Sequence, residues 1–209
     1  MFLINCSVVT FLCLFSKIVQ PGLLAEGTMA QIKHEIQRLL IRNGFGGARE
    51  FDVLEKCIQN SQSQSSANLR AIHDMHLLFN ALKENDIKIA VCTADNRANT
   101  ISMLRCFNVE ELVDIAVCGD DPGSKPKPHP HNANFICETL GVDPENAVMV
   151  GDTLADLGMA RAAGLGAAVG VLSGVGAVDH LESHADILVP HVGSLLTIFL
   201  GIDEFNKKS

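Results

Sequence analysis

The fold of this chain is decided by a stretch of ten residues, Ala147-Val148-Met149-Val150-Gly151-Asp152-Thr153-Leu154-Ala155-Asp156. Its apolar start predicts a buried strand, and the apolar spacing from Leu154 onward predicts a helix after it. Asp152 then lies at the tip of the strand, and Asp156 lies about one helical turn further on, facing the same side. Two carboxylates so placed suit Mg²⁺, although a helix N-cap followed by a first-turn acid explains them equally well. Asp152 and Asp156 are therefore the candidate metal ligands.

Short apolar strands and amphipathic helices alternate on both sides of this stretch. We expect strands at 87–92, 114–118, 147–150, 167–171 and 186–189, and helices at 69–82, 97–107, 131–140 and 154–163 and from 192 onward. This alternation is typical of a three-layer α/β fold, a Rossmann-like parallel sheet with helices on both faces. Because ligands of such sheets bind beyond the carboxyl ends of the strands, we expect the functional residues there.

A candidate anion site follows the predicted strand 87–92. Thr93 and Ala94 come directly after this strand, and a helix is expected to begin at Arg97. A hydroxyl beside the free amides of a helix N-terminus can donate hydrogen bonds to phosphate oxygens. The alternative is that Thr93 or Asp95 only caps the helix.

The loop 123–130, with the sequence Gly-Ser-Lys-Pro-Lys-Pro-His-Pro, offers a candidate cation. Proline at every second position stiffens the backbone, so that Lys127 is held with little conformational freedom. A fixed ammonium is useful beside a phosphate or a developing negative charge, although a basic, proline-rich surface loop is the simpler alternative. His129 and His131 are two residues apart, and without further ligands we interpret them as solvent-exposed loop residues.

The order and spacing of these residues resemble the second, third and fourth motifs of haloacid-dehalogenase-like (HAD) hydrolases. The three motifs are carried by Thr93, by Lys127-Pro128-His129-Pro130 and by Gly151-Asp152 with Asp156. The resemblance covers residues 69–200. The tail around 170–174 and 185–188 is similar to the phosphoglycolate-phosphatase-like branch of this family.

The resemblance implies a phosphatase that hydrolyses a small phosphate monoester with the help of Mg²⁺. It gives catalytic roles to Thr93, Lys127 and Asp152, and it gives phosphate binding to Thr93, Ala94 and Lys127. The metal ligands that it implies are Asp152 and Asp156. The expected partner is accordingly a small phosphorylated metabolite.

The first motif of the family is missing from this sequence. In HAD hydrolases a hydrophobic strand ends in DxDx[TV], whose first aspartate attacks phosphorus, and no DxD occurs in this chain. Without that nucleophile, covalent phosphoryl transfer has no acceptor, so the alternative is a catalytically inactive, truncated relative that only binds phosphate or a partner. The gap includes part of the cap and indicates an altered or truncated start. The strand-like run 8–15 is expected to fill the central slot of the sheet, ending at Ser16-Lys17 in place of DxD.

Four segments are expected along the chain. They are an apolar N-terminal segment at 1–20, a helical cap remnant at 21–60, a polar linker at 61–68 and the HAD-like α/β core at 69–209. The first segment includes the uncharged run 2–16, which we interpret either as a replacement core strand or as a signal-like segment. Amphipathic helical patterns from 29 and from 48 predict that the cap is small, helical and incomplete.

Composition excludes some classes of function. The chain has a net charge of −8 and contains no Trp and no Tyr, which argues against a nucleic-acid binder. Its seven cysteines are scattered singly and predict reduced thiols in a cytoplasmic protein. The apolar run 2–16 leaves secretion or membrane anchoring as the alternative location. The sequence does not indicate an oligomeric state.

Overall fold

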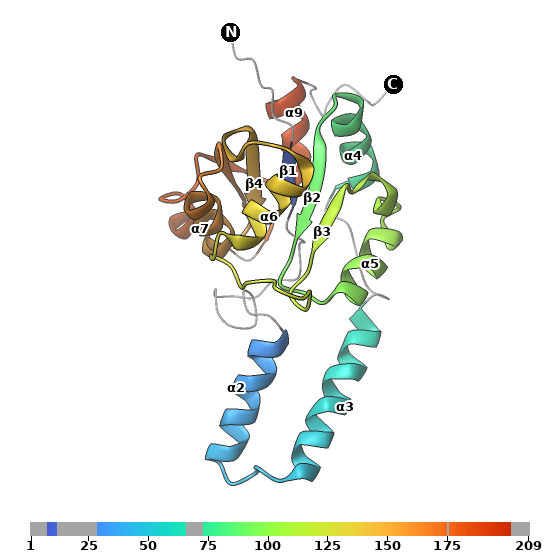
Figure 1. Ribbon diagram of the computed structural model, residues 1–209, viewed down its shortest axis with the longest axis vertical. Helices are drawn as coiled ribbons and strands as arrows, with labels where there is room; N and C mark the ends of the chain where they lie inside the picture. Colours follow the sequence, from blue (N-terminus) through green and yellow to red (C-terminus); the bar gives the residue numbers. More distant parts are fainter. Residues whose placement is uncertain (1–7, 12–28, 66–72, 175, 202–209) are drawn as a thin grey trace.

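The sheet at the centre of the molecule contains six parallel strands in the order β3-β2-β1-β4-β5-β6 (Figure 1). The computed structural model describes residues 8–11, 29–65, 73–174 and 176–201 of the 209-residue chain. The strands are β1 (Val8–Phe11), β2 (Lys88–Cys92), β3 (Ile115–Val117), β4 (Ala147–Gly151), β5 (Ala167–Val171) and β6 (Ile187–Val189). The predicted α/β class with a Rossmann-like parallel sheet is therefore confirmed.

Helices cover both faces of this sheet, as the alternation of elements requires. One core cluster holds side chains of α4 (Met75–Glu84), α5 (Arg97–Cys106) and α9 (Leu195–Leu200). A second cluster holds side chains of α6 (His131–Leu140), α7 (Leu154–Ala163) and α8 (Val178–Leu181). Three short 3₁₀ turns complete the described core, at Glu110–Leu112, Pro144–Asn146 and Val192–Ser194.

Strand β1 lies in the centre of the sheet, between β2 and β4. Its first residue, Val8, lies opposite Lys88 on one side and Ala147 on the other. Its last residue, Phe11, lies opposite Val91 and Val150 in the same way. This central position is the one that we expected for the N-terminal run if it forms a strand. The rest of that run, including Ser16-Lys17, lies outside the described residues.

Helices α2 (Met29–Arg42) and α3 (Ala48–Ser65) form a hairpin that projects away from the sheet (Figure 1). Helix α3 continues to Ser65, so the expectation of a polar linker was wrong for residues 61–65. The physical reason is that the run from Ser61 to Ser65 contains neither Gly nor Pro, and serine and glutamine are tolerated in a helix. Residues 66–68 of the expected linker lie outside the described residues.

Helix α4 begins later than the apolar spacing suggested. It begins at Met75, because Asp74 caps it by accepting a hydrogen bond from the backbone N–H of Leu77 at 3.0 Å. The expected helical residues 69–72 lie outside the described part. Within the described residues, no helix combines the length and the apolar character that a membrane crossing requires.

The core predicts a strong dependence of stability on the side chains that α4 buries. Leu78 is fully buried, so Leu78→Ala should lower the free energy of unfolding by about 2–5 kcal/mol through lost burial and the cavity left behind. The matched control is Val178→Ala in α8, where the side chain is 47% exposed and the expected change is within about 0.5 kcal/mol. Urea unfolding followed by circular dichroism measures both values. Equal losses in the two variants would contradict this packing.

Candidate active site

The carboxyl ends of β2 and β4 bring the predicted site residues to one edge of the sheet. Thr93 follows β2 and Asp152 follows β4, and both side chains are buried. Lys127 reaches this edge from the loop before α6 and donates a hydrogen bond of 3.1 Å to the backbone oxygen of Cys92. Strand β1 lies between β2 and β4. Three motifs that are far apart in the sequence therefore meet at this edge.

Lys127 is held by a buried ion pair. Its Nζ lies 2.7 Å from Oδ1 of Asp156, and its side chain is only 6% exposed. Burial by itself lowers the pKa of Lys127, but attraction to Asp156 and the hydrogen bond to it outweigh this, and the net effect raises the pKa above its ordinary value. The site therefore contains a charged ammonium whose position is fixed from two sides.

Asp156 is engaged through both of its carboxylate oxygens. Oδ1 pairs with Lys127, and Oδ2 accepts hydrogen bonds from the backbone N–H of Thr153 at 3.1 Å and from its hydroxyl at 2.7 Å. These contacts form a capping box at the start of α7. A Cβ at Gly151 would collide with the Asp156 side chain, which is why glycine is needed there. In the structure Asp156 therefore pairs with Lys127 and caps α7. Its role as a metal ligand stays a prediction.

Asp152 is the candidate metal ligand that this arrangement favours. It is buried at the end of β4, with the loop after β5 so close that a Cβ at Gly174 would overlap its carboxylate. Within the described residues no group of three His, Cys, Asp or Glu side chains could hold a metal ion. One carboxylate near the residues predicted to bind phosphate still fits Mg²⁺, because this ion is usually bound by one or two carboxylates together with water and substrate phosphates.

Thr93 and Ala94 form the turn after β2 and line a small hollow together with Lys127. The Thr93 hydroxyl accepts a hydrogen bond of 3.1 Å from the backbone N–H of Asp95. The N-cap of α5 is Asn96, which accepts from the backbone N–H of Asn99 at 2.8 Å. The alternative that Thr93 or Asp95 only caps this helix is therefore wrong. The hollow brings together all three residues predicted to bind phosphate.

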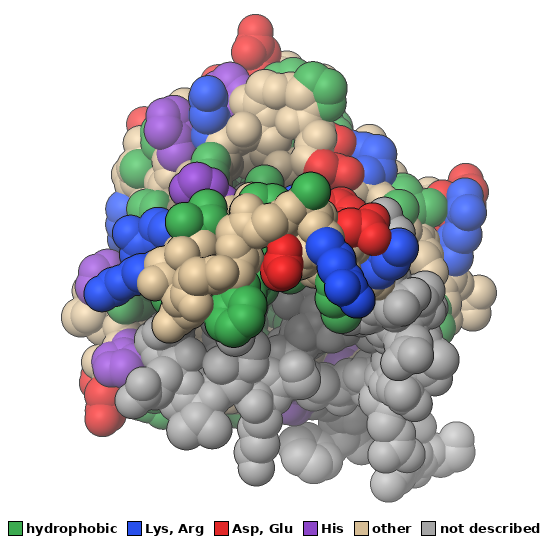
Figure 2. Space-filling view, turned by 90° about the horizontal axis from the view of Figure 1, so that it is seen from below, with side chains coloured by type: hydrophobic (Ala, Val, Ile, Leu, Met, Phe, Trp, Pro, Cys, Tyr) green, Lys and Arg blue, Asp and Glu red, His purple; other side chains and the backbone are tan. Residues whose placement is uncertain are grey.

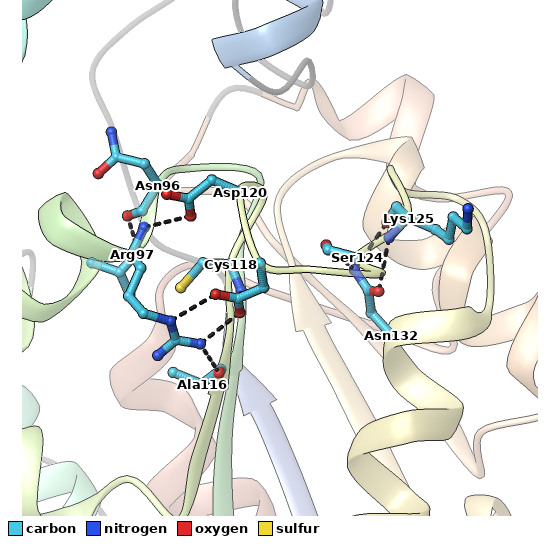
Figure 3. A network of polar contacts seen from close by, with 10 residues as sticks. Asn96, Arg97, Ala116, Cys118, Asp120, Ser124, Lys125 and Asn132 are labelled. Atoms are coloured by element: carbon cyan, nitrogen blue, oxygen red, sulfur yellow. Dashed lines mark hydrogen bonds and ion pairs between the residues drawn. The ribbon is translucent and has the colours of Figure 1, made fainter.

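Sequence reasoning missed Asn132, which fixes the loop before Lys127 (Figure 3). Its Oδ1 accepts from the backbone N–H of Lys125 at 3.0 Å, and its Nδ2 donates to the backbone oxygen of Lys125 at 2.9 Å and to the Ser124 hydroxyl at 3.1 Å. Asn132 is buried in the first turn of α6. The sequence signal that could have indicated this role is the position of Asn132 directly after the proline-rich loop. A buried amide there needs polar partners, and the backbone of the loop can supply them.

A second missed contact clamps the loop after β3 against α5. Arg97 donates to both oxygens of Asp121, at 2.7 and 2.5 Å, and to the backbone oxygen of Ala116 at 2.7 Å (Figure 3). Its backbone N–H donates to Asp120 at 2.8 Å. The hydrogen bond from Arg97 holds the pKa of Asp121 below its ordinary value, against the raising effect of burial.

The buried pair predicts that Lys127 supports the fold as well as the site. Lys127→Met leaves the buried carboxylate of Asp156 without its cation and should lower the free energy of unfolding by about 3–5 kcal/mol. The control Lys125→Met removes an exposed lysine of the same loop and should cost far less. Combining Lys127→Met with Asp156→Asn should recover part of the loss. Denaturant titration measures these values, and purely additive losses would contradict a direct pair.

The clamp predicts a dependence of stability on pH. Because the pKa of Asp121 is lower in the folded protein than its ordinary value of 3.8, its contribution is present above pH 3.8 and disappears as the pH falls through the folded pKa. Asp121→Asn should therefore lower the free energy of unfolding at pH 7. The difference from the unmodified chain should shrink as the pH falls below about 4. Urea unfolding at pH 7 and pH 3 tests this, and a difference that does not depend on pH would contradict it.

Comparison with known proteins identifies the family of this chain. A family model described as haloacid dehalogenase-like hydrolase matches residues 33–164. The phosphoglycolate phosphatase of Nitrosospira multiformis is 29% identical over 147 residues, 66% of this chain and 64% of that protein. The phosphoglycolate phosphatase of Neisseria meningitidis is 36% identical over 130 residues, 61% of this chain and 54% of that protein. The chain thus spans less than two thirds of the length of these curated relatives.

The fold is shared with a solved structure as well. The crystal structure of a predicted phosphoglycolate phosphatase from Haemophilus somnus 129pt superposes with a TM-score of 0.73 at 20% identity, over 84% of this chain and 79% of that one. At this identity the likeness shows the fold alone. The resemblance drawn from Thr93, Lys127 and Asp152 is confirmed by the family match, which spans all three residues. The chain therefore belongs to the haloacid dehalogenase-like hydrolases.

Proposed function

We propose that this chain is a HAD-type phosphatase that acts on a small phosphate monoester. The observation that carries the proposal is the buried Lys127, whose ammonium is fixed between the backbone oxygen of Cys92 and the carboxylate of Asp156. Lys127 lines the same small hollow as Thr93 and Ala94. A phosphate at the mouth of this hollow, which is itself only about 10 Å³, meets a charge that is already desolvated and oriented, so little reorganisation is needed on binding.

Each residue of the hollow has a separate task in this proposal. Lys127 neutralises charge on the phosphoryl oxygens, and its raised pKa keeps it protonated at neutral pH. The Thr93 hydroxyl and the backbone amide of Ala94 donate hydrogen bonds to two further phosphate oxygens. Asp156 acts through Lys127, because it holds the ammonium in place. The local positive charge of Lys127 is needed because the chain as a whole, with a net charge of −8, repels an anionic substrate.

Magnesium enters this proposal through Asp152. HAD phosphatases generally use Mg²⁺, and Asp152 is the residue of this chain that we propose as its protein ligand. When bound, the ion would neutralise phosphate charge and polarise the phosphoryl group. Phosphoglycolate is the first substrate to test, because two of the curated relatives carry the name phosphoglycolate phosphatase.

A second candidate function is phosphate binding without hydrolysis. The observation that favours it is the sequence itself, which contains no DxD for the first motif of the family. An enzyme that loses its nucleophile keeps its binding groups and loses most of its rate, about a million-fold in one well-studied hydrolase. The two candidates share the hollow and differ in turnover, so one set of variants separates them.

The proposal predicts Mg²⁺-dependent release of phosphate from p-nitrophenyl phosphate and from phosphoglycolate. Thr93→Val keeps the shape of the side chain but removes its hydroxyl, and it should lower kcat/KM by about tenfold or more. Asp152→Asn should remove the response to Mg²⁺. The control Arg105→Met changes an exposed cation in the last turn of α5, away from this hollow, and should keep the activity. Circular dichroism checks that each variant is folded.

The outcomes separate the two candidates. Turnover that depends on Mg²⁺, Thr93 and Asp152 supports the phosphatase. Binding of inorganic phosphate, measured by isothermal titration calorimetry and weakened by Thr93→Val, supports the binder if turnover stays at background. Background turnover together with undetectable phosphate binding by the folded chain would overturn both.

A further inference from the structure

The α2–α3 hairpin has apolar side chains that are largely exposed in the described part of the chain. Among the side chains of the hairpin that the structure describes, residues 30–57, none is buried. Four large apolar side chains are largely exposed there, namely Leu39, Ile41, Phe45 and Val53. Both helices are amphipathic, and such helices normally bury their apolar face against another element. Among the residues that the structure describes, the hairpin therefore has no layer that covers the apolar face predicted by its sequence pattern.

A groove of about 470 Å³ runs between the two helices. Its apolar wall is formed by Ile36 and Leu40 of α2, by Phe45 of the connecting turn, and by Val53 and Leu54 of α3. In Figure 1 the hairpin projects away from the sheet. Figure 2 shows the molecule from below, the side to which the hairpin projects, and there apolar and charged side chains lie next to one another. The groove is open to a partner that approaches from outside, because Phe45 and Val53 in its wall are more than half exposed.

We propose that the α2–α3 hairpin is an interface through which two copies of this chain associate about a two-fold axis. In such an interface the same surface is used on both copies, so it must be complementary to itself. Two hairpins packed face to face would form a four-helix bundle with the groove residues in its core. At about 1.5 Å per residue, α2 and α3 are about 21 and 27 Å long, enough for several turns of contact.

The distribution of charge makes the hairpin complementary to itself. Helix α2 carries three basic residues and one acidic residue, and α3 carries three acidic residues and two basic ones. A two-fold axis that places α2 of one copy against α3 of the other brings opposite net charges together twice. Within one copy, a basic residue of α2 already pairs with an acidic residue of α3, in the ion pair between Lys33 and Glu55.

The charge of the rest of the chain favours this surface over others. Residues 29–65 contain five lysines and arginines against four acids, whereas the remaining residues contain eleven against twenty. Two copies that approach through the core would therefore bring large negative charges together, but two hairpins would not. If an unrelated partner protein or a small apolar ligand occupied the groove instead, the purified chain would stay monomeric.

The first experiment measures the oligomeric state of the full 209-residue chain by sedimentation equilibrium over a range of concentrations. We expect a reversible monomer–dimer equilibrium. Val53→Asp places a charge in the groove and should raise the dissociation constant of the dimer about tenfold or more. The matched control is Val178→Asp on α8 of the core, because the two valines are similarly exposed, at 52% and 47%. The control should change the dissociation constant by less than about twofold.

A charge exchange tests the two-fold arrangement itself. One variant combines Arg38→Glu with Arg42→Glu and makes α2 acidic, and the other combines Glu50→Lys with Asp52→Lys and makes α3 basic. Each variant alone should dimerise about tenfold more weakly or worse, since both of its α2–α3 contacts become repulsive. An equimolar mixture should form heterodimers, because both contacts are then attractive again.

Three results would overturn the proposal. A chain that stays monomeric at all concentrations leaves the groove to another occupant. A dimer that Val53→Asp does not weaken forms through a different surface. Heterodimers that fail to form in the mixture contradict the pairing of α2 with α3. The experiment does not use phosphatase activity, so its outcome is independent of the proposed function.

Discussion

The buried ion pair between Lys127 and Asp156 is the contact on which the candidate site depends. It joins the loop before α6 to the first turn of α7, and the hydrogen bond from Lys127 to Cys92 ties both to the end of β2. A buried charge is tolerated only when it is paired and hydrogen-bonded, so neither partner can be lost without a cost to the fold. The stability of the fold and the proposed recognition of phosphate therefore depend on the same ammonium.

The parallel sheet explains why this contact can form. Parallel strands connected by helices all point the same way, so the turns after β2 and β4 emerge at one edge although more than 50 residues separate them. Strand β1 fills the space between these two strands and spaces their ends apart. The N-terminal run thus contributes to the geometry of the site through the backbone of β1, whatever side chains follow that strand.

Much of the core could be predicted from sequence, because its elements end at strong local signals. Helices α6 and α7 have the predicted bounds, and each ends at a glycine in the left-handed conformation, Gly141 and Gly164. The end of α3 was missed because a polar run without Gly or Pro fits a helix as well as a linker. The partners of Asp156 were missed for another reason. Helical spacing shows which way a carboxylate faces, but it does not show whether a metal or an ammonium meets it.

The hairpin differs from the core in how its apolar side chains are covered. In the core, each amphipathic helix meets the sheet, so its apolar pattern is accounted for by contacts within the chain. In α2 and α3 the same kind of pattern is present, but the described side chains remain uncovered. Leaving several large apolar side chains in water costs about 1.5–3 kcal/mol for each one that could be buried. Covering them with a second hairpin would recover that free energy without any change in the core, and the balanced charge of this segment permits the approach. The amphipathic pattern of residues 29–57 is therefore better explained by association than by the fold of a single copy.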